Sequence, residues 1–140
     1  MGRNLILALL LCVLTLPAAA IDPAPAFSDP GRQARYERLT GCWQAVHQGL
    51  AEIGLDYVID KEIQGHLVVT VKAPEDKKFE FFKLHDYCYE RGFTIYPGKM
   101  FGLETFRLCN LGQITERDIE DFFEVAKEAF ISMGYTLPLK

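Results

Sequence analysis

The sequence predicts an α+β fold in two layers, with a small, mostly antiparallel sheet and helices on one face of it. Two long segments, residues 31–53 and 115–133, repeat apolar residues at helical spacing. Short segments rich in β-branched and aromatic residues lie between them. A length of 140 residues, 49% of them apolar and 24% charged, suits one domain with a modest core.

Residues 1–20 are predicted to be a signal-peptide-like leader. Arg3 supplies a positive start, residues 5–16 form an apolar run, and Ala18-x-Ala20 fits a small-residue cleavage site. The run is short for a membrane span, which needs about 20 apolar residues. An uncleaved anchor or a chance apolar leader is the alternative. Residues 21–30 contain three of the seven prolines, which predicts an extended linker.

The first helix is expected to have Asp29 as its N-cap and Pro30 at its first helical position. Gly54 is the expected residue just beyond its end. Gly41 and Gly49 lie inside the helix, where each costs about 1 kcal/mol relative to alanine. They indicate close packing against another surface, or else a weak helix that is merely tolerated. The apolar stripe of this helix comprises Tyr36, Leu39, Trp43, Val46, Leu50 and Ile53.

The middle of the chain predicts two strands and a helix. Asp56–Asp60 is expected to form a short edge strand, and His66–Lys72 a central strand because it is rich in β-branched residues. Lys78–Arg91 is expected to be helical and to end at Gly92. One face of that helix carries Phe81, Leu84 and Cys88.

The segment GFTIYPGKMFGLETFRLCNLG, residues 92–112, predicts two further strands, Phe93–Tyr96 and Thr105–Cys109. A loop beginning at Pro97-Gly98 is expected to join them, because proline presets φ and glycine accepts positive φ.

Arg107 is the candidate binding residue of the second of these strands. Side chains alternate between the two faces of a strand, so Phe106 and Leu108 face the helices while Arg107 stands on the opposite face. Its planar guanidinium suits a carboxylate or a phosphonate. The interpretation that stays open is an ordinary polar residue on a solvated sheet face.

The last helix has the clearest start and end. Thr115-x-x-Asp118 predicts a capping box, and Gly134 a C-terminal stop. Arg117 and Asp121 are spaced for an i,i+4 ion pair. The inward face comprises Ile119, Phe122, Phe123, Ala126, Phe130 and Met133.

Composition argues against several classes of function. A net charge of −4 and a pI near 5.4 give no electrostatic reason to expect nucleic acid or an anionic membrane surface as a partner. Three cysteines lie outside the leader, namely Cys42, Cys88 and Cys109. Their number is odd and they form no CxxC pattern, which indicates buried free thiols in a protein of a reducing compartment. The histidines share no metal-ligand spacing: His47, His66 and His85.

The motifs GFTIYPGK and FRLCNLG resemble the C-terminal part of class V aminotransferases, which depend on pyridoxal phosphate. The similarity is greatest to the branch that transaminates 2-aminoethylphosphonate with pyruvate. It extends from about Ala34 to the C-terminus and does not reach residues 1–30. It implies that residues 31–140 are the small C-terminal domain of such an enzyme, a fold-type I α+β unit. Arg107 then matches the arginine that binds the acidic group of the substrate.

The resemblance also implies what the chain lacks. In this family the Schiff-base lysine belongs to a large domain upstream of the matched segment, and Lys99 of YPGK matches a turn residue instead. We therefore expect a fragment or remnant of a transaminase, inactive alone, without catalytic, cofactor-binding or metal-binding residues of its own. The expected partners are an aminotransferase large domain or a homodimer partner, and a small anionic amino substrate.

A second class of function stays open. The leader favours an exported, non-catalytic module that uses this fold to bind a small anion or a protein partner. The intact motifs and the odd number of cysteines favour a transaminase of cytoplasmic origin.

Overall fold

The computed structural model describes residues 29–100 and 102–139. The predicted leader and most of the predicted linker lie outside these ranges. Residues from Ala34 onward form one compact unit, separate from the residues before it. Within the short described part that precedes Ala34, Arg32 forms an ion pair with Asp29.

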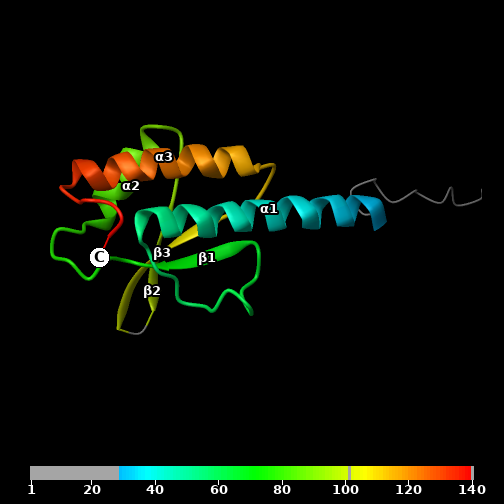
Figure 1. Cartoon of the computed structure of the whole chain (residues 1–140), viewed down its shortest axis with the longest axis horizontal. Helices are drawn as coiled ribbons and strands as arrows, with labels where there is room; N and C mark the ends of the chain where they lie inside the picture. The colour runs from blue at the N-terminus through cyan, green and yellow to red at the C-terminus, as the bar shows by residue number, and fades with distance from the viewer. Residues whose placement is uncertain (1–28, 101, 140) are drawn as a thin grey trace, which may run out of the picture. The chain divides into compact units, whose positions relative to one another are not determined.

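Three helices and three strands follow one another in this order: α1 (Asp29–Ile53), β1 (Val68–Lys72), α2 (Phe81–Tyr89), β2 (Tyr96–Met100), β3 (Leu103–Cys109) and α3 (Glu116–Ser132). The strands form one antiparallel sheet in the order β1-β3-β2. The helices of the compact unit gather on one side of this sheet (Figure 1). The predicted two-layer α+β class is confirmed.

The core fills the space between the helices and one face of the sheet. The sheet contributes four buried residues, Val69, Val71, Phe106 and Leu108. The helices contribute most of the rest, namely Cys42, Trp43, Val46, Leu50, Ile53, Leu84, Cys88, Ile119, Phe122, Phe123, Ala126, Ala129 and Phe130. Cys42 and Cys88 are thus buried as predicted, and Cys109 is half-buried.

Helices α1 and α3 run in the same direction and lie alongside each other (Figure 1). At Gly49 a β carbon would overlap the ring of Phe123, so the absence of a side chain allows the close approach. Farther along, Lys127 Nζ of α3 lies 3.2 Å from Glu52 Oε2 of α1. The prediction that the glycines of the first helix mark close packing is confirmed at Gly49.

The capping box of α3 is present as predicted. The Thr115 amide donates to Asp118 Oδ2 at 2.8 Å, and the Asp118 amide donates to Thr115 Oγ1 at 3.4 Å. Gly134 follows the helix at a φ of +84°, and Arg117 forms the expected pair with Asp121 at 2.9 Å.

The predicted edge strand at Asp56–Asp60 is wrong. Only Tyr57 forms a bridge, with Val71 of β1. The chain turns away at Asp60, whose carboxylate accepts the amide of Glu62 at 3.0 Å and whose carbonyl accepts that of Ile63 at 3.1 Å. Because the acidic side chain offers the backbone a local turn, pairing stops there.

The predicted central position of His66–Lys72 is also wrong, since β1 lies at one edge and β3 in the middle of the sheet. The strand is nonetheless covered on its outer side. The Val58 amide donates to the Thr70 carbonyl, and the Lys72 amide to the Asp56 carbonyl. Two such bonds protect an edge without forming a further strand.

The turn predicted at Pro97-Gly98 lies elsewhere. Both residues belong to β2, where Pro97 pairs with Phe106 and Gly98 with Thr105. The chain reverses near Gly102, which has a φ of +75°. Proline is accepted here because β2 is an edge strand, where a missing backbone donor need not interrupt a ladder. Glycine is required because a β carbon at residue 98 would contact the Thr105 hydroxyl.

The ends of the predicted helices and of their apolar stripes differ from expectation. Tyr36, at the start of the predicted apolar stripe, is 58% exposed because α1 extends beyond the sheet it covers. Helix α1 begins at Asp29, one residue before its predicted start, and ends before Gly54 as predicted. Helix α2 is shorter than predicted, with Glu80 as its N-cap. The outer predicted members of the stripes are half-buried: Leu39, Phe81 and Met133.

Candidate anion-binding site on the open sheet face

Arg107 lies in the middle of the central strand, on the face of the sheet that the helices leave uncovered. Phe106 and Leu108 on either side of it are buried, as the alternation predicts, whereas Arg107 is exposed. We call this surface the open face. The register places the following residues on it: Val68, Thr70 and Lys72 of β1; Tyr96 and Gly98 of β2; Thr105, Arg107 and Cys109 of β3.

One row of residues crosses all three strands at Arg107. Thr70 of β1 pairs with Arg107 on one side, and Tyr96 of β2 pairs with it on the other. Directly opposite residues of an antiparallel pair project from the same face and lie close enough to interact. The guanidinium therefore has a hydroxyl-bearing neighbour on each flanking strand, and Tyr96 is 56% exposed.

The other cation of the open face is already neutralised. Lys72 Nζ lies 2.6 Å from Asp56 Oδ2, and this hydrogen bond lowers the pKa of the Asp56 carboxyl. In residues 29–100 and 102–139, by contrast, no hydrogen bond or ion pair of the Arg107 guanidinium is found. Its full charge therefore faces outward, available to an anion.

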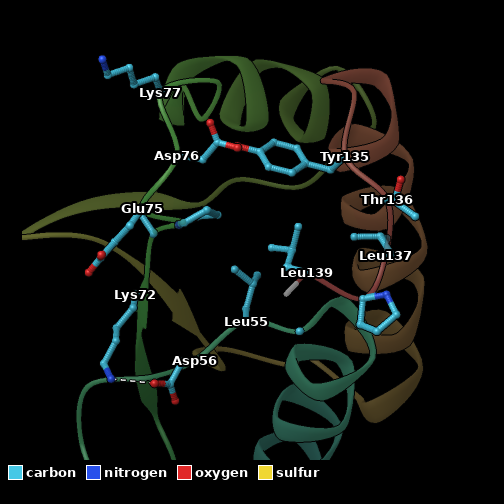
Figure 2. A pocket seen from close by; sticks show the side chains of 14 residues that line it. Leu55, Asp56, Lys72, Glu75, Asp76, Lys77, Tyr135, Thr136, Leu137 and Leu139 are labelled. Carbon is cyan, nitrogen blue, oxygen red and sulfur yellow. Dashed lines mark hydrogen bonds and ion pairs between the residues drawn. The ribbon is translucent and has the colours of Figure 1, made fainter.

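A groove next to the open face contains the Lys72–Asp56 pair (Figure 2). Its volume is about 1120 Å³, and it lies between the loop after β1 and the C-terminal segment 135–139. Figure 2 shows the Tyr135 ring pointing toward Asp76. The Tyr135 hydroxyl is buried and has no hydrogen-bond partner among the described atoms. Its pKa is raised, mainly by burial and to a smaller extent by the nearby negative charge of Asp76.

Sequence reasoning missed this groove because the C-terminal segment returns across the end of α1. The Leu139 amide donates to the Ile53 carbonyl at 2.7 Å, and Leu139 lies close to Gly54. No local pattern in the last six residues signals that contact. The groove holds charged and hydroxyl groups but no nucleophile with a hydrogen-bonded base, so it supports no catalytic assignment.

Trp43, His47 and Gln64 form a polar cluster beneath α1 that the sequence did not predict. Gln64 Oε1 lies 2.7 Å from Trp43 Nε1 and 2.8 Å from His47 Nε2. An indole N–H can only donate, so Gln64 presents its oxygen, and His47 must donate to it from Nε2. Burial lowers the pKa of His47. The cluster holds the loop before β1 against the helix, and the i,i+4 spacing of Trp43 and His47 was its only local signal.

The histidines and cysteines do not assemble into a metal site in the part of the chain that the structure describes. No group of three or more His, Cys, Asp or Glu side chains there has a geometry that could hold an ion. Cys42 instead donates to the Ile114 carbonyl at 3.4 Å, and burial raises the pKa of Cys88 to about 11. Among the described residues, no helix combines the length and hydrophobicity that a membrane span requires.

The arrangement of helices and strands is that of an aminotransferase domain. A ureidoglycine–glyoxylate aminotransferase from Bacillus subtilis superimposes with a TM-score of 0.67 at 16% identity, covering 75% of this chain and 27% of its own. No family model matches the sequence. At this identity the match establishes the fold.

Sequence similarity to curated proteins indicates which group of aminotransferases the chain resembles. A 2-aminoethylphosphonate–pyruvate transaminase of Polaromonas sp. is 36% identical over 105 residues, 75% of this chain and 27% of the relative. One from Lactiplantibacillus plantarum is 33% identical over 93 residues. A bifunctional phosphonoacetaldehyde hydrolase/aminoethylphosphonate transaminase of Clostridioides difficile is 31% identical over 100 residues. The chain is homologous to the 2-aminoethylphosphonate–pyruvate transaminases, as its motifs indicated, and spans about a quarter of the length of the Polaromonas enzyme.

The lysines of the described residues bear on pyridoxal phosphate, the cofactor that the aminotransferase resemblance implies. A Schiff-base lysine must offer a free amine near the substrate. Lys72 shares the open face with Arg107, and its Nζ is already paired with Asp56 Oδ2 at 2.6 Å. No lysine whose side chain is described is buried. Among the lysines whose side chains are described, none is therefore enclosed beside Arg107 as a Schiff-base lysine would be.

Proposed function

We propose that this chain supplies the substrate-binding small domain of a phosphonate transaminase, in which Arg107 binds the acidic group of the amino donor and of the acceptor. The observation that carries the proposal is the exposed, unpaired guanidinium in the middle of the open face. Relatives that act on 2-aminoethylphosphonate and pyruvate, as their names state, give the class of substrate.

In this proposal the open face is covered by an aminotransferase large domain, which holds the cofactor and its lysine. Covering the face removes water from around Arg107 and strengthens its attraction for an anion. Thr70 and Tyr96 beside Arg107 become part of the same enclosed surface. Whether the large domain is part of the same polypeptide or a separate one, its role is to bring the reacting amine to the cofactor.

A chimera tests the role of Arg107. Residues 34–140 replace the homologous segment of the Polaromonas transaminase, and Arg107→Lys is compared with Arg117→Lys, an exposed arginine on α3. Lysine keeps the charge but loses the two parallel bonds, so Arg107→Lys should lower kcat/KM by about 10- to 100-fold. Arg117→Lys should leave it unchanged. An unchanged kcat/KM for Arg107→Lys would make Arg107 an ordinary surface residue, and a large loss of Tm would make it a structural one.

The chain alone should neither hold pyridoxal phosphate nor transaminate. This expectation rests on the family resemblance, in which the Schiff-base lysine belongs to the large domain. Incubation with the cofactor should give no imine absorption that survives dialysis, and borohydride treatment should give no stoichiometric lysine adduct. A stable adduct together with turnover of 2-aminoethylphosphonate would contradict it.

The leader-like sequence of residues 1–20 favours a second candidate, an exported module that binds an anion without catalysis. The transcript upstream of the codon for Asp29 distinguishes the two. A large domain in frame with this segment supports the transaminase. A leader translated as it stands, followed by secretion, supports the exported module.

A further inference from the structure

The row of residues at Arg107 contains more than one group able to bind an anion. Arg107 is paired with Tyr96 on β2 and with Thr70 on β1, and all three project from the open face. A guanidinium and a phenol hydroxyl both stand at the far ends of long side chains. A threonine hydroxyl is attached to the β carbon and stays close to the sheet. Tyr96 and Arg107 therefore have side chains long enough for their polar ends to meet one anion above the strands.

Within residues 29–100 and 102–139, no hydrogen bond of the Tyr96 hydroxyl is found. The side chain is 56% exposed, and its ring is absent from the ring–ring and cation–ring contacts of these residues. A phenol hydroxyl can donate one hydrogen bond and accept others. Arg107 and Tyr96 thus offer, from adjacent strands, a planar two-pronged donor and a single donor beside it.

The number of oxygen atoms on the anion decides which of these donors it uses. A carboxylate has two oxygens, and the guanidinium binds both with two parallel hydrogen bonds. A phosphonate has three, arranged around a tetrahedral phosphorus, so one oxygen is left after the same two bonds are made. The lone pairs that a carboxylate keeps lie in the plane of the guanidinium, whereas the third phosphonate oxygen stands out of that plane, so a further donor beside the guanidinium favours the phosphonate.

We infer that Tyr96 is a specificity-determining residue, whose hydroxyl donates to the third oxygen of a phosphonate held by Arg107. This inference rests on the proposed function, in which the same arginine meets a phosphonate donor and a carboxylate acceptor. Arg107 binds both anions, and Tyr96 adds affinity for the phosphonate alone. Thr70, with its short side chain, supports the base of the site without reaching the anion.

The test uses the full chain and two probes that differ only in the acidic group, methylphosphonate and acetate. The Nε–H signal of Arg107 in a nitrogen–proton NMR spectrum, assigned by its loss in Arg107→Lys, reports binding of each. Tyr96→Phe removes the hydroxyl and keeps the ring, and Tyr89→Phe, the same change at an exposed tyrosine of α2, is the matched control. Because Tyr96 is exposed, Tyr96→Phe should leave the Tm unchanged.

The expected result is a selective loss. Tyr96→Phe should weaken methylphosphonate binding about tenfold, the range for one hydrogen bond to a charged group, and leave acetate binding within about a factor of two. Tyr89→Phe should change neither. Equal losses for both probes, or no loss for methylphosphonate, would overturn the inference while Arg107 binding still supports the proposed function. If neither probe shifts the Arg107 signal in the unmodified chain, the proposed anion site fails and the inference fails with it.

Discussion

Gly49 of α1 faces the ring of Phe123 of α3 with no room for a β carbon between them. The contact sets how closely these two parallel helices approach and therefore how both lie over the sheet. A helix glycine is normally a weakness, since alanine is favoured by about 1 kcal/mol. At this position packing against an aromatic ring outweighs that preference.

Gly49→Ala should destabilise the chain by about 1 to 3 kcal/mol, because the added methyl group forces the Phe123 ring or the helix to move. Gly41→Ala is the control within the same helix. Its β carbon would meet only the end of the flexible Glu116 side chain, so the helix propensity gain should prevail. Urea unfolding followed by circular dichroism measures both. An equal gain in stability for the two variants would show that α1 and α3 are not in close contact at Gly49.

Gln64→Leu should lower the free energy of unfolding by about 2 to 4 kcal/mol. Gln64 is 7% exposed and accepts from both Trp43 and His47, so its loss leaves two buried donors unpaired, each costing about 1 to 3 kcal/mol. Gln48→Leu, which removes a surface amide bonded to Glu52, should change stability little. Similar losses for the two variants would contradict a buried role for Gln64. Chemical unfolding monitored by Trp43 fluorescence suits this comparison.

His47 should make the chain less stable at mildly acidic pH. Burial lowers its pKa in the folded state below the ordinary 6.5, so the unfolded chain takes up the proton first. The contribution is complete above 6.5 and is lost as pH falls through the folded pKa. His47→Gln keeps a donor for Gln64 without titrating, and its stability should depend less on pH in this window. Parallel pH profiles for the two proteins would rule out His47 as the cause.

Cys88 should make the chain less stable at alkaline pH. Burial raises its pKa from 9.0 to about 11, so its contribution is complete below 9.0 and is lost as pH rises through 11. A shift of this size corresponds to about 2 to 3 kcal/mol. The fall in stability between these values should be smaller by that amount in Cys88→Ala, whose other titrating groups are the same. An identical fall in both proteins would show that the Cys88 thiol ionises freely in the folded chain.

Expression in a secreting host should give a chain that begins at Ile21. The prediction rests on Arg3, the apolar run at residues 5–16 and the Ala18-x-Ala20 site. Intact-mass analysis of the secreted protein identifies the new N-terminus. Retention of Met1 on a protein found only inside the cell would contradict export. Ala20→Pro places proline at the cleavage site and is expected to block processing without altering the compact unit that starts at Ala34.

The sequence alone determined those features that depend on neighbours in the chain. Three features are of this kind: the capping box of Thr115 and Asp118, the end of α3 before Gly134, and the alternation that exposes Arg107. Each depends only on residues a few positions apart. Local hydrogen bonds and the fixed periods of helix and strand suffice to produce them. The aminotransferase resemblance was likewise available from two short motifs.

Only the tertiary structure showed which strands lie side by side. Pro97 and Gly98 form a turn in isolation by their own preferences, yet they extend β2 because Phe106 and Thr105 of β3 lie opposite them. The position of β3 between β1 and β2 likewise gives Arg107 its neighbours, Thr70 and Tyr96. Strand pairing is a contact between distant parts of the chain, stabilised by packing across strands and absent from any local pattern.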